Sequence, residues 1–187
     1  MGRHANISIF VPHRGCPHRC SFCDQRAITG QAALPTSEAV AAVVRRGIET
    51  GFGGAKTAEI AFFGGSFTAI DRPEMLRLLD AAYPFVRSGA VDGIRVSTRP
   101  DAIDREVLEL LAARGVTAIE LGAQSMEQEV LKKNRRGHTP RDVENAAALI
   151  KACGFSLGLQ MMTGLPGDDD AGALRTADRL IALQPET

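Results

Sequence analysis

The stretch Gly15-Cys16-Pro17-His18-Arg19-Cys20-Ser21-Phe22-Cys23 contains three of the four cysteines in this chain of 187 residues. Its cysteines have the spacing Cys-x3-Cys-x2-Cys, so one tight loop can bring the thiolates of Cys16, Cys20 and Cys23 together. Clustered thiolates are soft ligands that select zinc or an iron–sulfur centre. A four-iron cluster usually takes four thiolates, and three from one loop would leave the fourth iron open for a small molecule. The spacing therefore predicts an iron–sulfur site in this loop.

A structural zinc site is the competing interpretation of the same loop. Zinc would need a fourth ligand, for which His13, His18 or Cys153 is available. Zinc motifs usually come as two paired half-sites, however, and the chain contains no second Cys-x2-Cys. We expect the two histidines to shape the loop and Cys153 to be a core thiol. A disulfide is disfavoured because nothing else in the sequence suggests secretion.

The composition is that of an ordinary globular domain. Hydrophobic residues make up 44% of the chain, and 22 basic residues balance 22 acidic ones, so a strongly basic nucleic-acid surface is not indicated. No apolar run approaches the roughly 20 residues needed to cross a membrane. The start of the chain is polar and shows no signal peptide. With four cysteines and no pairing pattern, these features favour a cytoplasmic protein that does not bind membranes.

Strand-like and helix-like segments alternate along the chain. Short apolar runs rich in branched residues predict five strands, near residues 7–11, 57–63, 93–97, 116–122 and 155–162. Such alternation predicts an α/β fold with a parallel sheet and right-handed crossovers, as either a (β/α) barrel or a doubly wound sheet. No Gly-x-Gly-x-x-Gly loop follows the first strand, which weighs against a dinucleotide site.

Three segments carry start signals for the predicted helices. Thr36 or Ser37 is placed to cap one helix, and Thr139-Pro140 has the N-cap and first-turn proline of another. Asp71, with Glu74 three residues later, is spaced like a capping box.

Polar and glycine-rich segments follow the predicted strands, which places them at one edge of a parallel sheet. The cysteine loop follows the first strand, and Gly64-Gly65-Ser66 follows the second. Paired glycines just past a strand allow a ligand to approach the backbone closely, although an ordinary tight turn would use the same residues.

The cysteine loop resembles that of the radical S-adenosylmethionine (SAM) superfamily. In that superfamily the open iron chelates the amino and carboxylate groups of SAM, and the reduced cluster cleaves a carbon–sulfur bond to give a 5′-deoxyadenosyl radical. The resemblance implies a partial (β/α) barrel in which Cys16, Cys20 and Cys23 hold one [4Fe-4S] cluster. It also implies SAM as a partner and an electron donor such as ferredoxin or flavodoxin.

The resemblance extends to residues that would bind SAM. Phe22 is similar to the aromatic residue before the third cluster cysteine, and Gly64-Gly65-Ser66 stands where the superfamily has a Gly-Gly-Glu-like motif. Arg136 matches a position that contacts SAM, and its guanidinium suits a carboxylate. The superfamily often has a carboxylate at the end of strand three, where this chain departs with Ser97. The implied SAM-binding residues are Phe22, Gly64, Gly65, Ser66, Ser97, Gln124, Arg136 and Gln160.

Longer segments resemble, more narrowly, the radical SAM domain of the catalytic subunit of Elongator and its bacterial homologues. They are Gly65–Thr68, Ser97–Asp101, Glu120–Ser125, Arg136–Thr139 and Gln160–Gly167. This resemblance implies modification of tRNA, although the chain has no acetyltransferase-type domain after the core. Oxygen-independent coproporphyrinogen oxidase-like proteins, which act on a tetrapyrrole, share the cysteine spacing and two of the turns and are the alternative. A noncatalytic cluster protein and a structural zinc-binding module are the alternatives from other classes.

Radical SAM cores usually have six parallel strands, whereas five are predicted here. The sequence reaches Thr187 just after its fifth crossover helix, where the resembling proteins continue into a sixth strand. We therefore expect residues 1–187 to form one radical SAM core domain that is truncated at its C-terminus. Such a core would leave an unpaired backbone edge on the fifth strand and apolar surface on the last helix.

Overall fold

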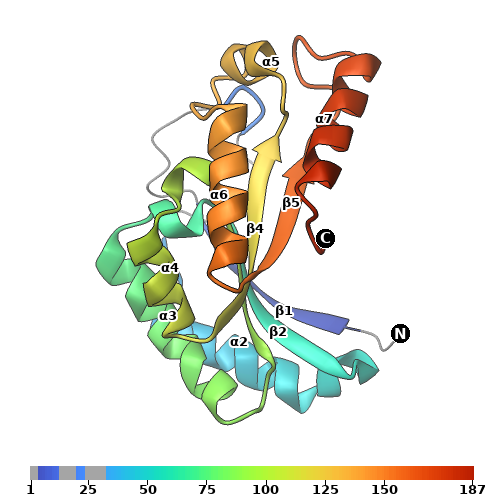
Figure 1. Ribbon diagram of the computed structural model, residues 1–187. Helices are drawn as coiled ribbons and strands as arrows, with labels where there is room; N and C mark the ends of the chain where they lie inside the picture. Colours follow the sequence, from blue (N-terminus) through green and yellow to red (C-terminus); the bar gives the residue numbers. More distant parts are fainter. Residues whose placement is uncertain (1–3, 13–19, 24–32) are drawn as a thin grey trace.

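The computed structural model of the chain describes residues 4–12, 20–23 and 33–187 (Figure 1). Within these residues, five parallel strands form one sheet in the order β1-β2-β3-β4-β5. This arrangement confirms the expected α/β fold. A doubly wound sheet reverses its strand order at a switch point, so the unbroken sequential order excludes that alternative. The strands are β1 (His4–Val11), β2 (Thr57–Gly64), β3 (Gly93–Thr98), β4 (Val116–Gln124) and β5 (Ser156–Met161).

Helices connect the strands and pack outside the sheet. Figure 1 shows α3, α4 and α6 on one side of the sheet and α7 beside β5. Three short 3-10 helices, at Gly51–Gly54, Phe67–Ala69 and Pro100–Ala102, were not predicted. The α-helices among the described residues are α2 (Ser37–Glu49), α3 (Arg72–Arg87), α4 (Arg105–Ala112), α5 (Gln128–Lys133), α6 (Pro140–Ala152) and α7 (Asp170–Ala182).

Two of the three predicted helix caps are present. Thr36 Oγ1 accepts a hydrogen bond from Ala39 N at 3.2 Å, and Thr139 forms a capping box with Asp142 at the start of α6. Asp71 precedes α3 but makes no capping hydrogen bond with its side chain. The Glu74 carboxylate instead accepts hydrogen bonds from Arg77, because a charged donor on the next turn binds it more strongly than a backbone N–H.

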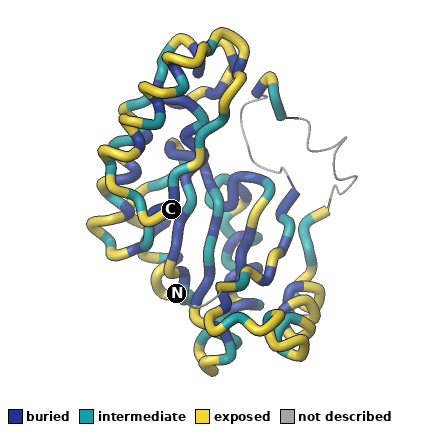
Figure 2. Tube along the Cα trace, turned by 90° about the vertical axis from the view of Figure 1, so that its right-hand side faces the viewer, coloured by how far each residue is buried: buried dark blue, intermediate teal, exposed yellow. Residues whose placement is uncertain are grey.

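The hydrophobic core lies between the helices and one face of the sheet. Successive side chains of a strand point to opposite faces, so every second residue contributes to this core. Figure 2 shows buried residues along the strands and exposed residues on the outer turns of the helices. Each large side chain that is fully buried stabilises the fold by about 1.5–3 kcal/mol. The strand residues in this core include Ile60, Phe62, Ile94, Val96, Ile119 and Leu121.

The opposite face of the sheet carries polar and charged side chains. Arg95 of β3 bridges Glu59 of β2, at 2.9 Å, and Glu120 of β4, at 3.2 Å. These side chains are between 11% and 24% exposed, so each charge needs its partner. This face corresponds to the inner surface of the expected barrel.

Backbone hydrogen bonds pair part of the outer edge of β5. The prediction of an unpaired edge is therefore wrong for the residues in the middle of this strand. Glu186 N donates to Leu157 O at 2.9 Å, and Leu159 N donates to Thr187 O at 2.9 Å. The residues after α7 therefore run alongside β5 and satisfy backbone groups that would otherwise lack partners. The predicted apolar surface on the last helix is confirmed, because Leu174 and Ile181 of α7 are 68% and 69% exposed.

No helix in the described part of the chain combines the length and the apolar character needed to cross a membrane.

Candidate functional site

The carboxyl ends of the five parallel strands lie at one edge of the sheet, where two of the three loop cysteines are described. Cys20 is 6% exposed, and Cys23 N donates to Cys20 O at 3.1 Å, so one tight turn holds both residues. Phe22 lies in the same turn and is partly exposed. Cys16 lies outside the described residues. Among the described residues, no group of three or more His, Cys, Asp or Glu side chains is placed to hold a metal ion.

Arg136 reaches the cysteine turn from 116 residues further along the chain. Its Nη1 donates to Cys20 Sγ at 3.7 Å, and its Nη2 donates to Gly122 O at 2.5 Å. The side chain is buried, and its Nε has no hydrogen-bond partner among the described residues. A buried donor of this kind calls for a partner, and an anionic ligand would supply one. The structure thus brings Cys20 and Arg136, two of the predicted site residues, into direct contact.

Gly122 makes this contact possible and was not predicted as a site residue. A Cβ atom at Gly122 would lie 2.9 Å from Arg136 Nη2 and 2.6 Å from Gln124 Nε2. Gln124, a predicted SAM residue at the end of β4, has a φ of 67° and therefore turns the chain sharply there. The sequence could have indicated Gly122 as a site residue, because it lies two residues before Gln124 and residues two apart on a strand point to the same face.

Asn134 is a second residue that sequence reasoning missed. It is 1% exposed, and its side-chain oxygen accepts a hydrogen bond from Ser21 Oγ at 2.6 Å. Its backbone oxygen accepts another from Ser21 N at 3.2 Å. Its Nδ2 donates to Val130 O at 2.8 Å and to Pro166 O at 3.0 Å. One side chain thus joins the cysteine turn to the segments that follow β4 and β5.

The glycine-rich turn after β2 is fixed against β1. Gly64 has a φ of 111°, and a Cβ atom there would lie 2.4 Å from the Phe10 ring and 2.8 Å from Val11 O. Only glycine fits that position without strain. Gly65 N donates to Val11 O at 2.7 Å, which holds the turn beside the strand that leads into the cysteine loop.

Ser66 is buried within the same turn. Its Oγ lies 2.9 Å from Thr98 Oγ1 and accepts a hydrogen bond from Arg99 N at 3.1 Å. The hydroxyl therefore joins the ends of β2 and β3, and a role for Ser66 in SAM binding stays a prediction.

Ser97 and Gln160 meet at a carboxylate that had no predicted role. Gln160 Nε2 donates to Glu120 Oε2 at 2.6 Å, and Ser97 Oγ donates to the same oxygen at 3.4 Å. Glu120 is the register partner of Ser97. A carboxylate is thus present beside Ser97 at that level of the sheet, and β4 supplies it.

His138 and Arg99 support the backbone around Arg136. Arg99 Nη2 donates to Arg136 O at 2.7 Å, and its Nε donates to Asp101 at 2.7 Å. His138 Nε2 donates to Ala123 O at 3.1 Å, while its buried Nδ1 has no partner in the part of the chain that the structure describes. Burial, and then the charge of Arg136, lower the pKa of His138 from 6.5 to about 4. His138 is therefore neutral at pH 7. Burial alone would raise the pKa of Asp101, but hydrogen bonds from Arg99 and its charge outweigh burial and lower it.

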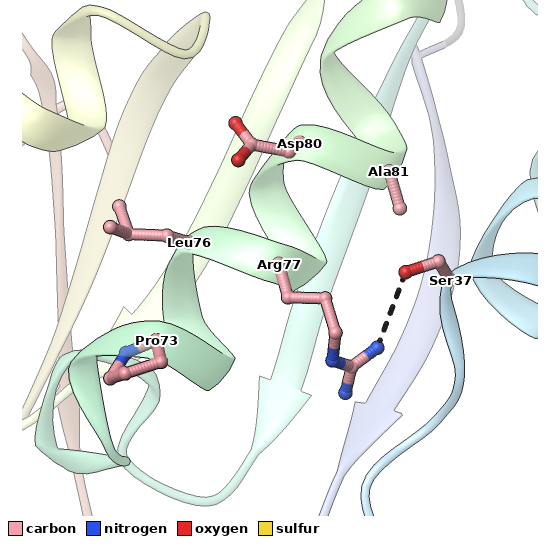
Figure 3. A pocket seen from close by; sticks show the side chains of 6 residues that line it. All are labelled: Ser37, Pro73, Leu76, Arg77, Asp80 and Ala81. Atoms are coloured by element: carbon pink, nitrogen blue, oxygen red, sulfur yellow. Dashed lines mark hydrogen bonds between the residues drawn. The ribbon is translucent and has the colours of Figure 1, made fainter.

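Pockets among the described residues also lie away from the contact between Cys20 and Arg136. One of about 530 Å³ lies over α3 and the start of α2, where Arg77 donates to Ser37 Oγ at 3.4 Å (Figure 3). No predicted site residue lines it. Another, of about 280 Å³, lies behind the Arg136 segment and is lined by Gln128, Lys132, Arg135, Gly137, His138 and Thr139.

Comparison with known proteins gives a family for this geometry. A family model described as the radical SAM superfamily matches residues 10–180. An uncharacterized protein of Methanocaldococcus jannaschii is 30% identical over 92% of this chain and 56% of its own length. A tRNA uridine(34) acetyltransferase of Dehalococcoides mccartyi is 25% identical over 86% of this chain and 42% of its own. The heme chaperone HemW of Bacillus subtilis is 29% identical over 81% of this chain and 41% of its own. The chain thus spans about half the length of these relatives.

Solved structures show the same fold. Elp3 of the archaeon Methanocaldococcus infernus superposes with a TM-score of 0.68 at 20% identity, over 95% of this chain and 42% of that one. TsrM of Kitasatospora setae, solved with cobalamin and a [4Fe-4S] cluster bound, has a TM-score of 0.69 at 20% identity. The match covers 98% of this chain and 33% of TsrM. HemN of Escherichia coli, described as a radical SAM enzyme, has a TM-score of 0.68 at 19% identity. The match covers 99% of this chain and 43% of HemN.

Proposed function

Because this chain belongs to the radical SAM superfamily, we propose that Cys16, Cys20 and Cys23 hold a [4Fe-4S] cluster and that the neighbouring strand ends bind SAM. The observation that carries the proposal is the contact between Cys20 Sγ and the buried guanidinium of Arg136 at the carboxyl edge of the sheet. The residues present fit the cofactors: the thiols are soft ligands, and Arg136 Nε, which no described residue pairs with, is a donor that suits an anion.

The predicted residues at the strand ends have separate roles in this proposal. The backbone around Gly64 and Gly65 would receive the amino group of SAM, and Gln124 and Arg136 would bind polar groups at the far side of the site. Ser97 and Gln160, oriented by Glu120, would form its floor. When bound, the reduced cluster supplies the electron that cleaves SAM to a 5′-deoxyadenosyl radical. A ferredoxin or flavodoxin would deliver that electron.

The substrate class that we propose is tRNA. The tRNA uridine(34) acetyltransferase relative supports it, since the match covers 86% of this chain. The pocket of about 280 Å³ behind Arg136 adds support, because the exposed cations Lys132 and Arg135 line it and suit the phosphates of RNA. A tetrapyrrole is the second candidate, favoured by the 29% identity to the heme chaperone HemW.

Binding to the reconstituted protein distinguishes these substrates. We expect a tRNA pool to bind, and the double variant Lys132→Glu, Arg135→Glu to bind it at least tenfold more weakly. Reversing two charges changes the salt-dependent contact with phosphate. Arg45→Glu, an exposed cation on α2, is the matched control and should bind like the wild type. Saturable binding of haem, with no binding of tRNA, would contradict the proposal and support the tetrapyrrole alternative.

A further inference from the structure

Segment 134–136 holds the cysteine turn at two points. At the first, Asn134 receives two hydrogen bonds from Ser21, one from its backbone and one from its hydroxyl. At the second, Arg136 donates to Cys20 Sγ. Asn134 and Arg136 are buried, whereas Arg135 between them is exposed. We refer to Asn134 and Arg136 together as the clasp.

The clasp is itself rigidly supported. Asn134 Nδ2 donates to two carbonyl oxygens, and Arg136 is fixed by Gly122 O on its side chain and by Arg99 on its backbone oxygen. A hydrogen-bonded side chain in such a network has little freedom to move away from its partner. The clasp therefore sets where the second cluster cysteine lies, in addition to contacting it.

Arg136 also carries a charge that no carboxylate among the described residues neutralises. None of the ion pairs between described residues includes Arg136, and within the same residues its Nε has no hydrogen-bond partner. The charge of a buried guanidinium acts strongly on its neighbours because little water screens it. Hydrogen bonds to the sulfur ligands and nearby charge are known determinants of the reduction potential of an iron–sulfur cluster.

We propose that the clasp is a positioning and tuning device for the cluster, in which Asn134 fixes the turn that bears Cys20 and Arg136 raises the reduction potential through its N–H···S bond. The inference rests on the proposed cluster. Reduction adds one negative charge to the cluster, and a positive donor beside a ligating sulfur stabilises the more negative state. Arg136 thereby favours reduction of the cluster before SAM is bound. This effect is separate from any contact that Arg136 makes with SAM.

A redox titration without SAM tests the role of Arg136. The full chain and its variants are reconstituted anaerobically with iron and sulfide, and the reduced cluster is followed by electron paramagnetic resonance at set potentials. Arg136→Met should lower the ratio of reduced to oxidised cluster about tenfold at a fixed potential, which is about 59 mV for one electron. Arg136→Lys keeps the charge and should fall between Met and wild type. Lys133→Met, an exposed neighbour, is the control and should match the wild type.

The role of Asn134 has a separate readout. Asn134→Ala should release iron to a chelator several times faster than wild type, and Ser21→Ala, which removes only the hydroxyl partner, should have a smaller effect in the same direction. Combining the two should add little to Asn134→Ala alone, because both changes break the same hydrogen bond.

The outcomes separate this inference from the proposed function. A wild-type chain that takes up no iron and sulfide contradicts the proposed function. If the cluster forms with equal iron content in all variants, but Arg136→Met and Arg136→Lys keep the wild-type potential, the tuning role is wrong. Should Arg136→Met not fold, the comparison of Arg136→Lys with wild type decides the question in the same way. Unchanged iron release in Asn134→Ala would remove the positioning role.

Discussion

His138 shows how the neighbours of the site set the charge of a single residue. Its ring is 2% exposed and donates to Ala123 O, and it lies near the charges of Arg136, Arg99 and Asp101. Its pKa of about 4 in the folded chain is below the ordinary 6.5. Between these values the unfolded chain binds more protons than the folded one, so the free energy of unfolding rises with pH in that window. Acidification from pH 7 toward pH 4 therefore weakens the fold.

We predict that His138→Gln removes this acid sensitivity. The Gln amide can still donate to Ala123 O but does not titrate. Lowering the pH from 7 to 5 should cost the wild type about 2 kcal/mol more of unfolding free energy than it costs the variant, from about 1.36 kcal/mol for each pKa unit. Urea unfolding at both pH values measures the difference. Asp101, whose pKa is lowered, loses its contribution only at more acidic pH, so it does not affect this window. Equal pH dependence in the two proteins would contradict the account.

At the scale of the elements, apolar patterning was enough to predict every strand of the sheet. The largest error in a boundary is in β1, which begins at His4 and was predicted from residue 7. His4, Ala5 and Asn6 break the apolar pattern, yet they pair with residues 57–59 of β2, because one face of the strand is polar. The motifs also predicted Cys20, Gln124 and Arg136 as site residues, and the structure places Cys20 and Arg136 in contact. Asn134 and Glu120 could not be predicted, because their roles depend on partners such as Ser21 and Gln160 that only the folded chain brings near.

The turn after β2 gives the prediction at this scale. Gly65→Val adds a branched side chain at the backbone that we expect to meet SAM, while the cysteine turn is left unchanged. The variant should therefore lose SAM binding, measured by equilibrium dialysis, with iron and sulfide content equal to wild type. Gly65→Ala should have an intermediate effect because its side chain is smaller. Wild-type affinity for SAM in Gly65→Val would remove this turn from the site.

At the scale of the whole molecule, the fold brings predicted site residues together at the carboxyl edge of the sheet. All five strands of the sheet contribute to it: β1 leads to the cysteine loop, β2 to the glycine turn, β3 to Ser97 and β4 to Gln124. The last strand adds Gln160, held by Glu120. Parallel strands place their carboxyl ends together, so residues far apart in the sequence converge without further design. This chain spans about half the length of the relatives described above, and the residues that we propose to hold the cluster and SAM lie within it.

The most direct test is anaerobic reconstitution of the full chain with iron and sulfide, followed by reduction, addition of SAM and quantification of 5′-deoxyadenosine. We predict broad visible absorbance and formation of 5′-deoxyadenosine in the wild type and in Cys153→Ala, which removes a thiol outside the loop. Cys16→Ala, Cys20→Ala and Cys23→Ala should each lose both signals. A colourless wild type that retains zinc in air, or one that holds iron and sulfide but never cleaves SAM, would contradict the central claim.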